Sequence, residues 1–266
     1  MIGALIFAFN NEQIDYVSMA TWSARRIHHH LDIPVCLVTD HNTSNNSDFE
    51  HIINIVPAVA SQRHFSDYQQ DVAWYNGDRV DAYALSPWDT TLVLDADYVV
   101  ASDRLRTLFN SDQDFLAHNS AYDVTGCNDF SGLNKFGQHR MPMYWATVML
   151  FKRSTQAQLI FESMAMIKNN WTHYRQIYNN PRGAYRNDHA LTIALGTVNG
   201  HVLNHTAIPW SLASLTPEHQ LMQTDSNSFR VDFVTDNNKP RWIELHGQDF
   251  HAMGKKNLGE IVASAG

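Results

Sequence analysis

Two carboxylates stand two positions apart within the segment Thr-Leu-Val-Leu-Asp-Ala-Asp-Tyr-Val-Val at 91–100. Its β-branched and aliphatic residues are typical of a fully buried strand, which would end at the acidic pair. Burying Asp95 and Asp97 there costs free energy unless a positive partner neutralises them. The usual partner is a divalent cation, because carboxylate oxygens suit Mg²⁺ or Mn²⁺, and such a cation can hold a diphosphate. The alternative interpretation is a solvated strand end with a capped turn.

Alternating strands and helices are expected to position this pair. Along the first 110 residues the sequence predicts strands at 2–9, 35–39, 52–56 and 91–94, and helices at 13–31 and 78–85. This βαβ rhythm predicts an α/β fold with a mainly parallel central sheet flanked by helices. Ligands of such sheets lie at the carboxyl ends of the strands, so residues 9–11, Asp40 and the acidic pair are expected at one edge.

The second half of the chain has a less regular pattern. Residues 119–142 are rich in Gly, Asn, Asp and Ser, which favours a long functional or mobile loop. Ser154 is the expected N-cap of a helix, and Gly196 the expected end of a later one. The elements predicted after the loop are a strand at 142–152, helices at 155–170 and 187–195, and short strands around Val202, at 229–234 and at 242–245.

The length of 266 residues fits one large α/β domain. Hydrophobic residues make up 44 % of the chain and charged residues 17 %, as in globular rather than disordered proteins. The formal net charge of −8 argues against tight non-specific nucleic-acid binding, which needs clustered Lys and Arg. Cys36 and Cys127 define no disulfide framework and fit a reducing cytoplasm, and the apolar start at 1–9 is too short for a membrane span.

Four motifs, in the same order along the chain, resemble those of GT-A glycosyltransferases, closest to the family 8 enzymes such as glycogenin and the bacterial galactosyltransferases. Asp95-Ala96-Asp97 is similar to the family's DxD motif, and Arg79 stands where the family has a basic residue near the donor phosphates. Asn187-Asp188-His189 resembles the Asp-Gln-Asp region beside the transferring sugar. His251-Ala252-Met253-Gly254-Lys255 resembles the C-terminal His-x-x-Gly motif with its Lys. The sequence departs from the family at Ala146-Thr147-Val148-Met149, where the family has Asn-x-Gly-Val, and lacks the closing Lys-Pro-Trp.

The resemblance implies a GT-A fold and a set of ligand-binding residues. Asp95, Asp97 and His251 would hold a divalent cation, Mn²⁺ or Mg²⁺, and this O, O, N set suits Mn²⁺ somewhat better. The cation would neutralise the diphosphate of a nucleotide-sugar, with a UDP-sugar as the expected donor. The other expected donor-binding residues are Phe9, Asn10, Asn11, Tyr16 and Asp40 at the base and ribose, Ala96 beside a sugar or ribose, and Arg79, Gly254 and Lys255 at the phosphates.

The expected catalytic residues are Asp188 and His189. Asp188 would lie nearest the anomeric carbon, where it orients sugar hydroxyls or stabilises an oxocarbenium-like state; its other interpretation is a helix N-cap. The resemblance implies that transfer to the acceptor hydroxyl retains the anomeric configuration. A single domain at 1–266 is expected, with a nucleotide-sugar-binding half at 1–118 and an acceptor half at 119–266 that includes the metal- and phosphate-contacting tail.

The acceptor stays open between a glycan, a small molecule and, as for several bacteriophage enzymes, a hydroxymethylated DNA base. Trp145, Trp210 and Trp242 are candidates for stacking on a sugar or base, or for the core. A basic rim for DNA would consist of Arg182, Arg186, Lys239 and Arg241, and the net charge of −8 counts against it. The rival functions are a nucleotidyltransferase, disfavoured because the first loop is neither Gly-rich nor basic, and a non-catalytic nucleotide-sugar-binding module. The expected location is the cytoplasm, that of the host if the protein is viral.

Overall fold

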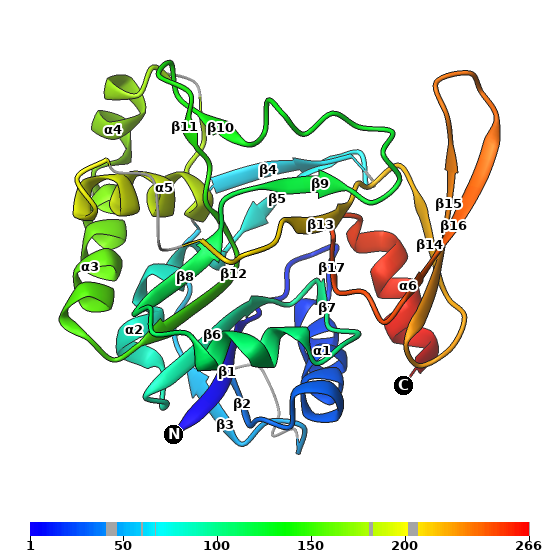
Figure 1. The fold of residues 1–266 in the computed structure, drawn as a ribbon, viewed down its shortest axis with the longest axis horizontal. Helices are drawn as coiled ribbons and strands as arrows, with labels where there is room; N and C mark the ends of the chain where they lie inside the picture. The colour runs from blue at the N-terminus through cyan, green and yellow to red at the C-terminus, as the bar shows by residue number, and fades with distance from the viewer. Residues whose placement is uncertain (41–46, 60, 67, 181–182, 202–206, 266) are drawn as a thin grey trace.

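A mixed sheet forms the centre of the molecule in the computed structural model, which describes residues 1–40, 47–59, 61–66, 68–180, 183–201 and 207–265 (Figure 1). The strand order, among the described residues, is β3-β2-β1-β6-β12-β8. These strands are β1 (Ile2–Phe7), β2 (Val35–Thr39), β3 (His51–Asn54), β6 (Thr90–Asp95), β8 (Phe115–His118) and β12 (Trp145–Lys152). The first four are parallel, and β12 runs antiparallel to β6 and β8. The predicted α/β fold with a mainly parallel central sheet is confirmed.

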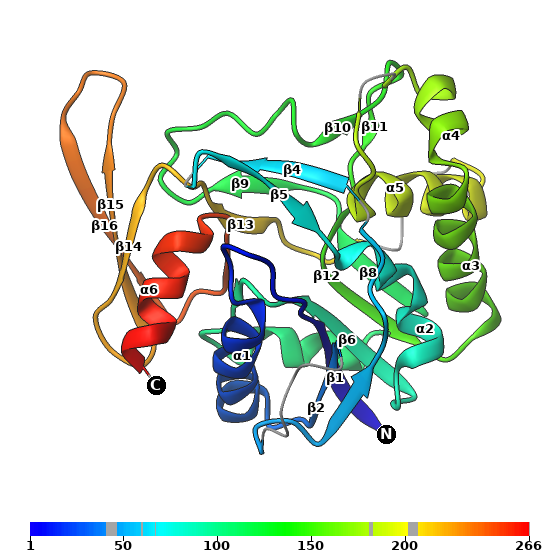
Figure 2. The same ribbon diagram turned by 180° about the vertical axis from the view of Figure 1, so that it is seen from behind.

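Helices cover the two faces of this sheet. The α-helices are α1 (Tyr16–Leu31), α2 (Ala82–Leu85), α3 (Thr155–Asn169), α4 (Trp171–Ile177), α5 (Asn187–Val198) and α6 (Lys255–Ala265), and the 3₁₀ helices are η1 (Asn76–Asp81) and η2 (Arg104–Asn110). The helix α3 packs on α5, and α6 packs on α1 (Figures 1 and 2). Buried Ala20, Ala24 and Ile27 form the apolar stripe of α1, as expected for an amphipathic helix on a sheet.

A second sheet brings the C-terminal segment to the end of β6. It has the order β7-β17-β13-β9, with β7 at Tyr98–Val99, β9 at Ala121–Asp123, β13 at Leu212–Leu215 and β17 at Phe250–Ala252. The strand β17 runs antiparallel to β7 and pairs His251 with Tyr98. The N–H of Ala252 donates to the carbonyl oxygen of Asp97 at 3.0 Å. This pairing fixes the tail beside the acidic pair.

Three smaller strand groups complete the fold. They are the hairpin of β4 (Ser61–Phe65) and β5 (Gln70–Trp74), the pair of β10 (Lys135–Phe136) and β11 (Met141–Pro142), and the antiparallel sheet of β14 (Gln220–Gln223), β15 (Ser228–Val234) and β16 (Pro240–His246). The sheet of β14, β15 and β16 lies at the opposite end of the molecule from α3 and α4 (Figures 1 and 2). Among the described helices, none combines the length and the apolar character needed to cross a membrane.

Several boundaries differ from the sequence prediction for local physical reasons. The first helix begins at Tyr16 rather than residue 13, because the carboxylate of Asp15 caps it by accepting from the N–H of Ser18 at 2.9 Å. The helix α5 continues through Gly196 to Val198, so the predicted end at Gly196 is wrong. Ser154 does cap α3, since its hydroxyl accepts from the N–H of Ala157.

Other segments contain helices or strands that the sequence analysis did not predict. The expected loop at 119–142 contains β9, β10 and β11, which are too short to leave a periodic pattern. The helical segment at 78–85 is a 3₁₀ turn followed by one short α-helix. The predicted strand around Val202 lies outside the described residues. The hairpin β4–β5 and the terminal helix α6 were not predicted.

Candidate active site

A cavity of about 640 Å³ opens at the carboxyl ends of β1 and β6. It is lined by Phe7 at the end of β1 and Phe9 just after it, and by Asp95 at the end of β6 and Asp97 just after it. Since β12 runs antiparallel, its first residues rather than its last lie at this edge, as the lining by residues 145–147 shows. A volume of roughly 300–1,000 Å³ is usual for sites that bind small molecules. The cavity therefore lies where ligands of open α/β sheets bind.

Two carboxylates and an imidazole converge in this cavity. Ligand atoms of Asp95, Asp97 and His251 all lie within 4.8 Å of one another, and the Nε2 of His251 is 3.4 Å from an oxygen of Asp97. The Nδ1 of His251 is buried and has no hydrogen-bond partner among the described residues. Two oxygens and one imidazole nitrogen at this separation fit a divalent cation such as Mn²⁺ or Mg²⁺. The three residues that the sequence predicted as metal ligands are thus brought together.

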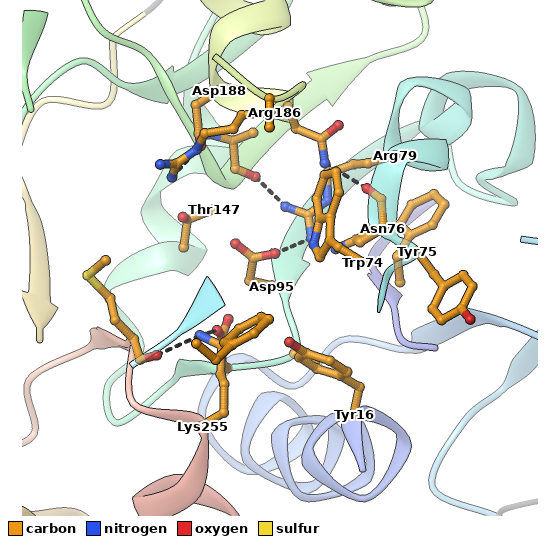
Figure 3. Close-up of a pocket in the computed structure, with 18 of the residues that line it drawn as sticks. Tyr16, Trp74, Tyr75, Asn76, Arg79, Asp95, Thr147, Arg186, Asp188 and Lys255 are labelled. Carbon is orange, nitrogen blue, oxygen red and sulfur yellow. Dashed lines mark hydrogen bonds and ion pairs between the residues drawn. The ribbon is translucent and has the colours of Figure 1, made fainter. Parts of the chain in front are cut away.

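Each acid also contacts a cation of the chain itself. The ammonium of Lys255 pairs with Asp97. The guanidinium of Arg79 pairs with Asp95 (Figure 3). Burial alone would raise the pKa of Asp97, but the Lys255 ammonium and the His251 imidazole outweigh it and hold that pKa well below its usual range. The Asp97 carboxylate is therefore ionised, and the chain itself places a cation beside each of the two acids.

Lys255 begins the helix α6 and is almost fully buried. Its Nζ lies 3.3 Å from the carbonyl oxygen of Ala252 and 3.1 Å from that of Met253, in addition to its contact with Asp97. The preceding Gly254 packs on Pro217, because a Cβ at position 254 would lie 3.2 Å from the Cα of Pro217. The helix N-terminus and the ammonium thus place positive charge directly beside the Asp97 carboxylate.

Arg79 lies at the end of η1 with only 1 % of its surface exposed. Its Nη1 donates to the carbonyl oxygen of Ala146 at 2.7 Å, while its Nη2 pairs with Asp95. The N–H of Ala146 donates in turn to Oδ1 of Asp188 at 2.9 Å. A continuous series of contacts therefore joins Asp95 to Asp188 on the other side of the cavity (Figure 3).

Asp188 belongs to the first turn of α5 and lines the cavity. Its second carboxylate oxygen accepts from Nε of Arg186 at 3.2 Å and lies 3.1 Å from Nη2 of the same residue. The N-cap is Arg186, so the N-cap interpretation of Asp188 is wrong. His189 also lines the cavity, and its ring stacks on Trp171 with centroids 5.6 Å apart and packs against Phe136 at 4.8 Å.

In the loop after β1, the side chain of Asn10 contacts the start of α1, and the side chain of Asn11 lines the cavity. The carbonyl oxygen of the Asn10 side chain accepts from the N–H of Val17 at 2.9 Å, which ties it to α1. Asn11 accepts from Gln13 and Ile14 and donates to the carbonyl oxygen of Ala73 in β5 at 3.3 Å. Of the residues predicted to bind the donor, those that line the cavity include Phe9, Asn11, Tyr16, Arg79 and Ala96. The described residues that line it do not include Asn10, Asp40 or Gly254.

The wall opposite α1 was missed by the sequence analysis. It comes from the hairpin β4–β5 and the turn that follows, and its cavity-lining residues include His64, Phe65, Trp74, Tyr75 and Asn76. The sequence pattern that could have predicted this wall is the alternation of buried Val72 and Trp74 in β5. The strand is too short for that alternation to be recognised. The cavity therefore has an aromatic side that no motif marks.

The suggested basic rim is not assembled at the cavity. Arg186 lines the cavity, whereas Lys239 and Arg241 belong to the turn and strand of the distant hairpin β15–β16 (Figures 1 and 2). Arg182 lies outside the described residues. Of the tryptophans, Trp145 lines the cavity while nearly buried, and Trp242 is 55 % exposed on β16.

The sequence matches no family model and no curated protein. Solved structures with partial similarity include the glycosyltransferase GlyE of Streptococcus pneumoniae TIGR4, at 12 % identity over 73 % of this chain and 43 % of that one, with a TM-score of 0.43. The galactosyltransferase LgtC in complex with donor and acceptor sugar analogs has 14 % identity over 73 % of this chain and 70 % of that one, with a TM-score of 0.46.

Mouse xyloside xylosyltransferase 1 in its apo form has 12 % identity over 76 % of this chain and 84 % of that one, with a TM-score of 0.44. The chain spans less than half the length of the GlyE chains that it matches. Identities and TM-scores at this level do not show membership of a family.

Proposed function

We propose that this chain is a metal-dependent glycosyltransferase that moves a sugar from a nucleotide-sugar, expected to be a UDP-sugar, to an acceptor hydroxyl. The observation on which this depends is the convergence of Asp95, Asp97 and His251, with ligand atoms within 4.8 Å of one another, in a cavity of about 640 Å³. Solvated carboxylates at a strand end would not need a partly buried imidazole from a segment distant in the sequence beside them. The four-motif resemblance supplies the reaction class.

The leaving group would be held by the acidic corner of the cavity. Asp95, Asp97 and His251 would bind the cation, which supplies charge neutralisation to the departing nucleoside diphosphate. Lys255 adds an ammonium beside Asp97 at the start of α6, where the backbone N–H groups also favour an anion. Contact of Arg79 with the phosphates, the other prediction from the sequence, stays untested.

The nucleoside would occupy the side of the cavity formed by the loop after β1 and the hairpin β4–β5. Phe9 and Tyr16 line it from one side, and Trp74 and Tyr75 from the other. Aromatic rings offer faces on which a base can stack. Asn11 joins the two sides through its bond to Ala73, which suits it to hold the donor's base or ribose. The role of Asp40 stays a prediction.

The transferring sugar would lie between the acidic pair and α5. Asp188 is held there by Ala146 and Arg186, and a fixed carboxylate can orient sugar hydroxyls or stabilise positive charge at the anomeric carbon. His189 lies beside it against Trp171. Retention of the anomeric configuration and an acceptor glycan or small molecule are part of the proposal. A DNA acceptor loses support because Lys239 and Arg241 are distant from the cavity (Figures 1 and 2).

A second candidate is a nucleotide-sugar-binding module without transfer. It is favoured by one observation: Arg79 and Lys255 already pair with Asp95 and Asp97, so the cavity has internal cations that can offset a diphosphate. Such a module would bind the donor and leave its glycosidic bond intact.

Calorimetric titration with UDP, with and without Mn²⁺, tests the proposal. We expect metal-dependent binding in the wild-type chain and its loss in Asp97→Asn, with hydrolysis of a UDP-sugar lost in parallel. The matched control is Asp123→Asn, since Asp123 is another buried carboxylate beside a histidine, 3.6 Å from Nε2 of His219, outside the described lining of the cavity. Binding without metal and without hydrolysis would support the module instead, and absence of UDP binding would contradict both.

A further inference from the structure

Arg79 contacts both sides of the cavity through a single buried guanidinium. We propose that Arg79 is a positioning residue: it holds Asp95 and, through the backbone of Ala146, Asp188 at a fixed separation, rather than binding the donor phosphates. Because Asp188 faces the reacting sugar only under the proposed function, this inference rests on that function. The contacts themselves do not depend on it.

The backbone of Ala146 is free to make these contacts because the sheet is irregular there. The strand β12 pairs regularly with β6 only over Val148–Lys152, and its register against β8 shifts between Trp145 and Met149. Buried N–H and C=O groups outside a ladder need other partners. The carbonyl oxygen of Ala146 accepts from Arg79 at 2.7 Å, and its N–H donates to Asp188 at 2.9 Å. Because of this irregularity, the backbone of Ala146 connects the side chains of Arg79 and Asp188; we call this connection the relay.

A guanidinium is required at position 79 because two acceptors must be held at once. Nη1 and Nη2 belong to one rigid plane, so the carbonyl oxygen of Ala146 and the carboxylate of Asp95 are fixed relative to each other. A lysine ammonium on a flexible stem can contact either acceptor without fixing the angle between them. The side chain is 1 % exposed, so reaching a phosphate would require Arg79 to leave a buried ion pair.

The segment that carries Arg79 is itself anchored on two sides. The side chain of Asn187, the residue before Asp188, donates to the carbonyl oxygen of Asn76 at 2.8 Å and joins α5 to η1. Lys168 of α3 pairs with Asp78 of η1. These contacts hold η1 against α3 and α5, so Arg79 is placed by elements that also place Asp188.

Arg79 therefore joins two carboxylates that have different proposed roles in the reaction. Asp95 belongs to the leaving-group side of the cavity and Asp188 to the sugar side. A displacement of about 1 Å between groups that flank a reacting bond can lower a rate by roughly 100-fold. Arg79 is therefore expected to affect turnover, whereas a phosphate-binding residue would affect donor affinity.

Hydrogen exchange at the amide of Ala146, followed by NMR, tests the contacts without any assay of activity. We expect Arg79→Lys and Asp188→Ala each to accelerate that exchange by about 10-fold or more, because each removes one side of the relay. The matched control is Arg153→Lys, because the guanidinium of Arg153 donates to the carbonyl oxygens of Ser86 and Trp88 rather than to Ala146, and this variant should leave the Ala146 amide unchanged. Unchanged exchange in Arg79→Lys overturns the relay. Arg79→Lys is chosen over Arg79→Met because it keeps the buried positive charge beside Asp95 and so should fold.

Steady-state kinetics with a UDP-sugar tests the consequence. Arg79→Lys should lower kcat by roughly 100-fold with the donor KM within about twofold of wild type. Its effect should be non-additive with that of Asp188→Ala, since both act through the same contact. A higher KM with unchanged kcat would assign Arg79 to the phosphates and overturn the inference. If the wild-type chain turns over no donor, the proposed function fails, while the exchange experiment still decides whether Arg79 holds the two carboxylates.

Discussion

The ammonium of Lys255 and the carboxylate of Asp97 form an ion pair although they lie far apart in the sequence. The pair exists because β17 runs beside β7, which places the first residue of α6 directly below the carboxyl end of β6. His251 reaches the same carboxylate from β17. Asp97 is thus shared between an internal cation and the proposed metal, and this sharing leads to the first prediction.

Replacing Lys255 with Met should weaken UDP binding by about 10-fold, because a charge-assisted hydrogen bond contributes roughly 1.5–3 kcal/mol. Uridine, which has no phosphate, should bind wild type and variant equally. Calorimetric titration of both ligands in the presence of Mn²⁺ measures the difference. The control is Lys256→Met, because the neighbouring Lys256 is exposed. Equal losses in the two variants, or an equal loss for uridine, would contradict a phosphate contact by Lys255.

Replacing Gly254 with Ala should displace the start of α6. The new Cβ would lie 3.2 Å from the Cα of Pro217, so either the backbone of Pro217 or that of Lys255 has to move by a few tenths of an ångström. We expect UDP affinity to fall several-fold. Gly259→Ala is the matched control in the same helix, where the Cβ would make an ordinary 3.5 Å contact with Met19. That variant should raise the free energy of unfolding by about 0.5–1 kcal/mol, from helix propensity, and leave UDP affinity unchanged.

The stability of the protein should depend on pH through His118. Burial is the main cause that lowers the pKa of His118 to about 4, partly opposed by its hydrogen bond to the carbonyl oxygen of Trp210. A group with a depressed pKa contributes stability above its unfolded value near 6.5 and loses it as the pH falls through its folded value. The free energy of unfolding should therefore fall by roughly 3 kcal/mol between pH 7 and pH 4 on account of this residue.

Urea unfolding of wild type and His118→Asn across this pH range measures that contribution. Asn keeps a donor for the carbonyl oxygen of Trp210 but cannot take up a proton, so the dependence between pH 7 and pH 4 should flatten. His173→Asn, at an exposed position, should keep the wild-type slope. A wild-type slope in His118→Asn would mean that the imidazole is not buried as described.

The two cysteines should differ in reactivity. Cys36 lies in β2 with 0 % exposure, and burial raises the pKa of its thiol to about 12. Since the thiolate is the reactive form, a maleimide should label the partly exposed Cys127 in the native protein and Cys36 only after unfolding. Mass spectrometry of timed samples gives both rates. Labelling of Cys36 as fast as Cys127 would contradict a central position of β2 between β1 and β3.

Local patterns predicted the parts of the fold that local interactions determine. The buried strand β2 ends at Thr39, as the apolar run and the following Asp40 indicated. Ser154 was identified as an N-cap because a hydroxyl at that position satisfies a free N–H at the helix start. The convergence of the predicted ligands Asp95, Asp97 and His251 followed from the family resemblance rather than from periodicity.

The rest of the site depends on contacts between distant segments. The pairing of Arg79 with both Asp95 and Ala146 requires the register shift of β12, which no residue in that strand marks. The aromatic wall containing Trp74 depends on the short hairpin β4–β5, whose strands are too brief for a pattern. The partners of Asp188 likewise follow from tertiary packing of α5 against β12.

The central claim, that the acidic pair and His251 bind a metal together with a nucleoside diphosphate, is tested most directly by pulsed electron paramagnetic resonance of Mn²⁺ bound with UDP. The protein should be labelled with ¹⁵N-histidine, so that a ligand nitrogen is seen through its coupling to the Mn²⁺ spin. We predict one such coupling in wild type, its loss in His251→Gln, and its persistence in His219→Gln. No histidine coupling in a wild-type sample that binds both Mn²⁺ and UDP would contradict the account.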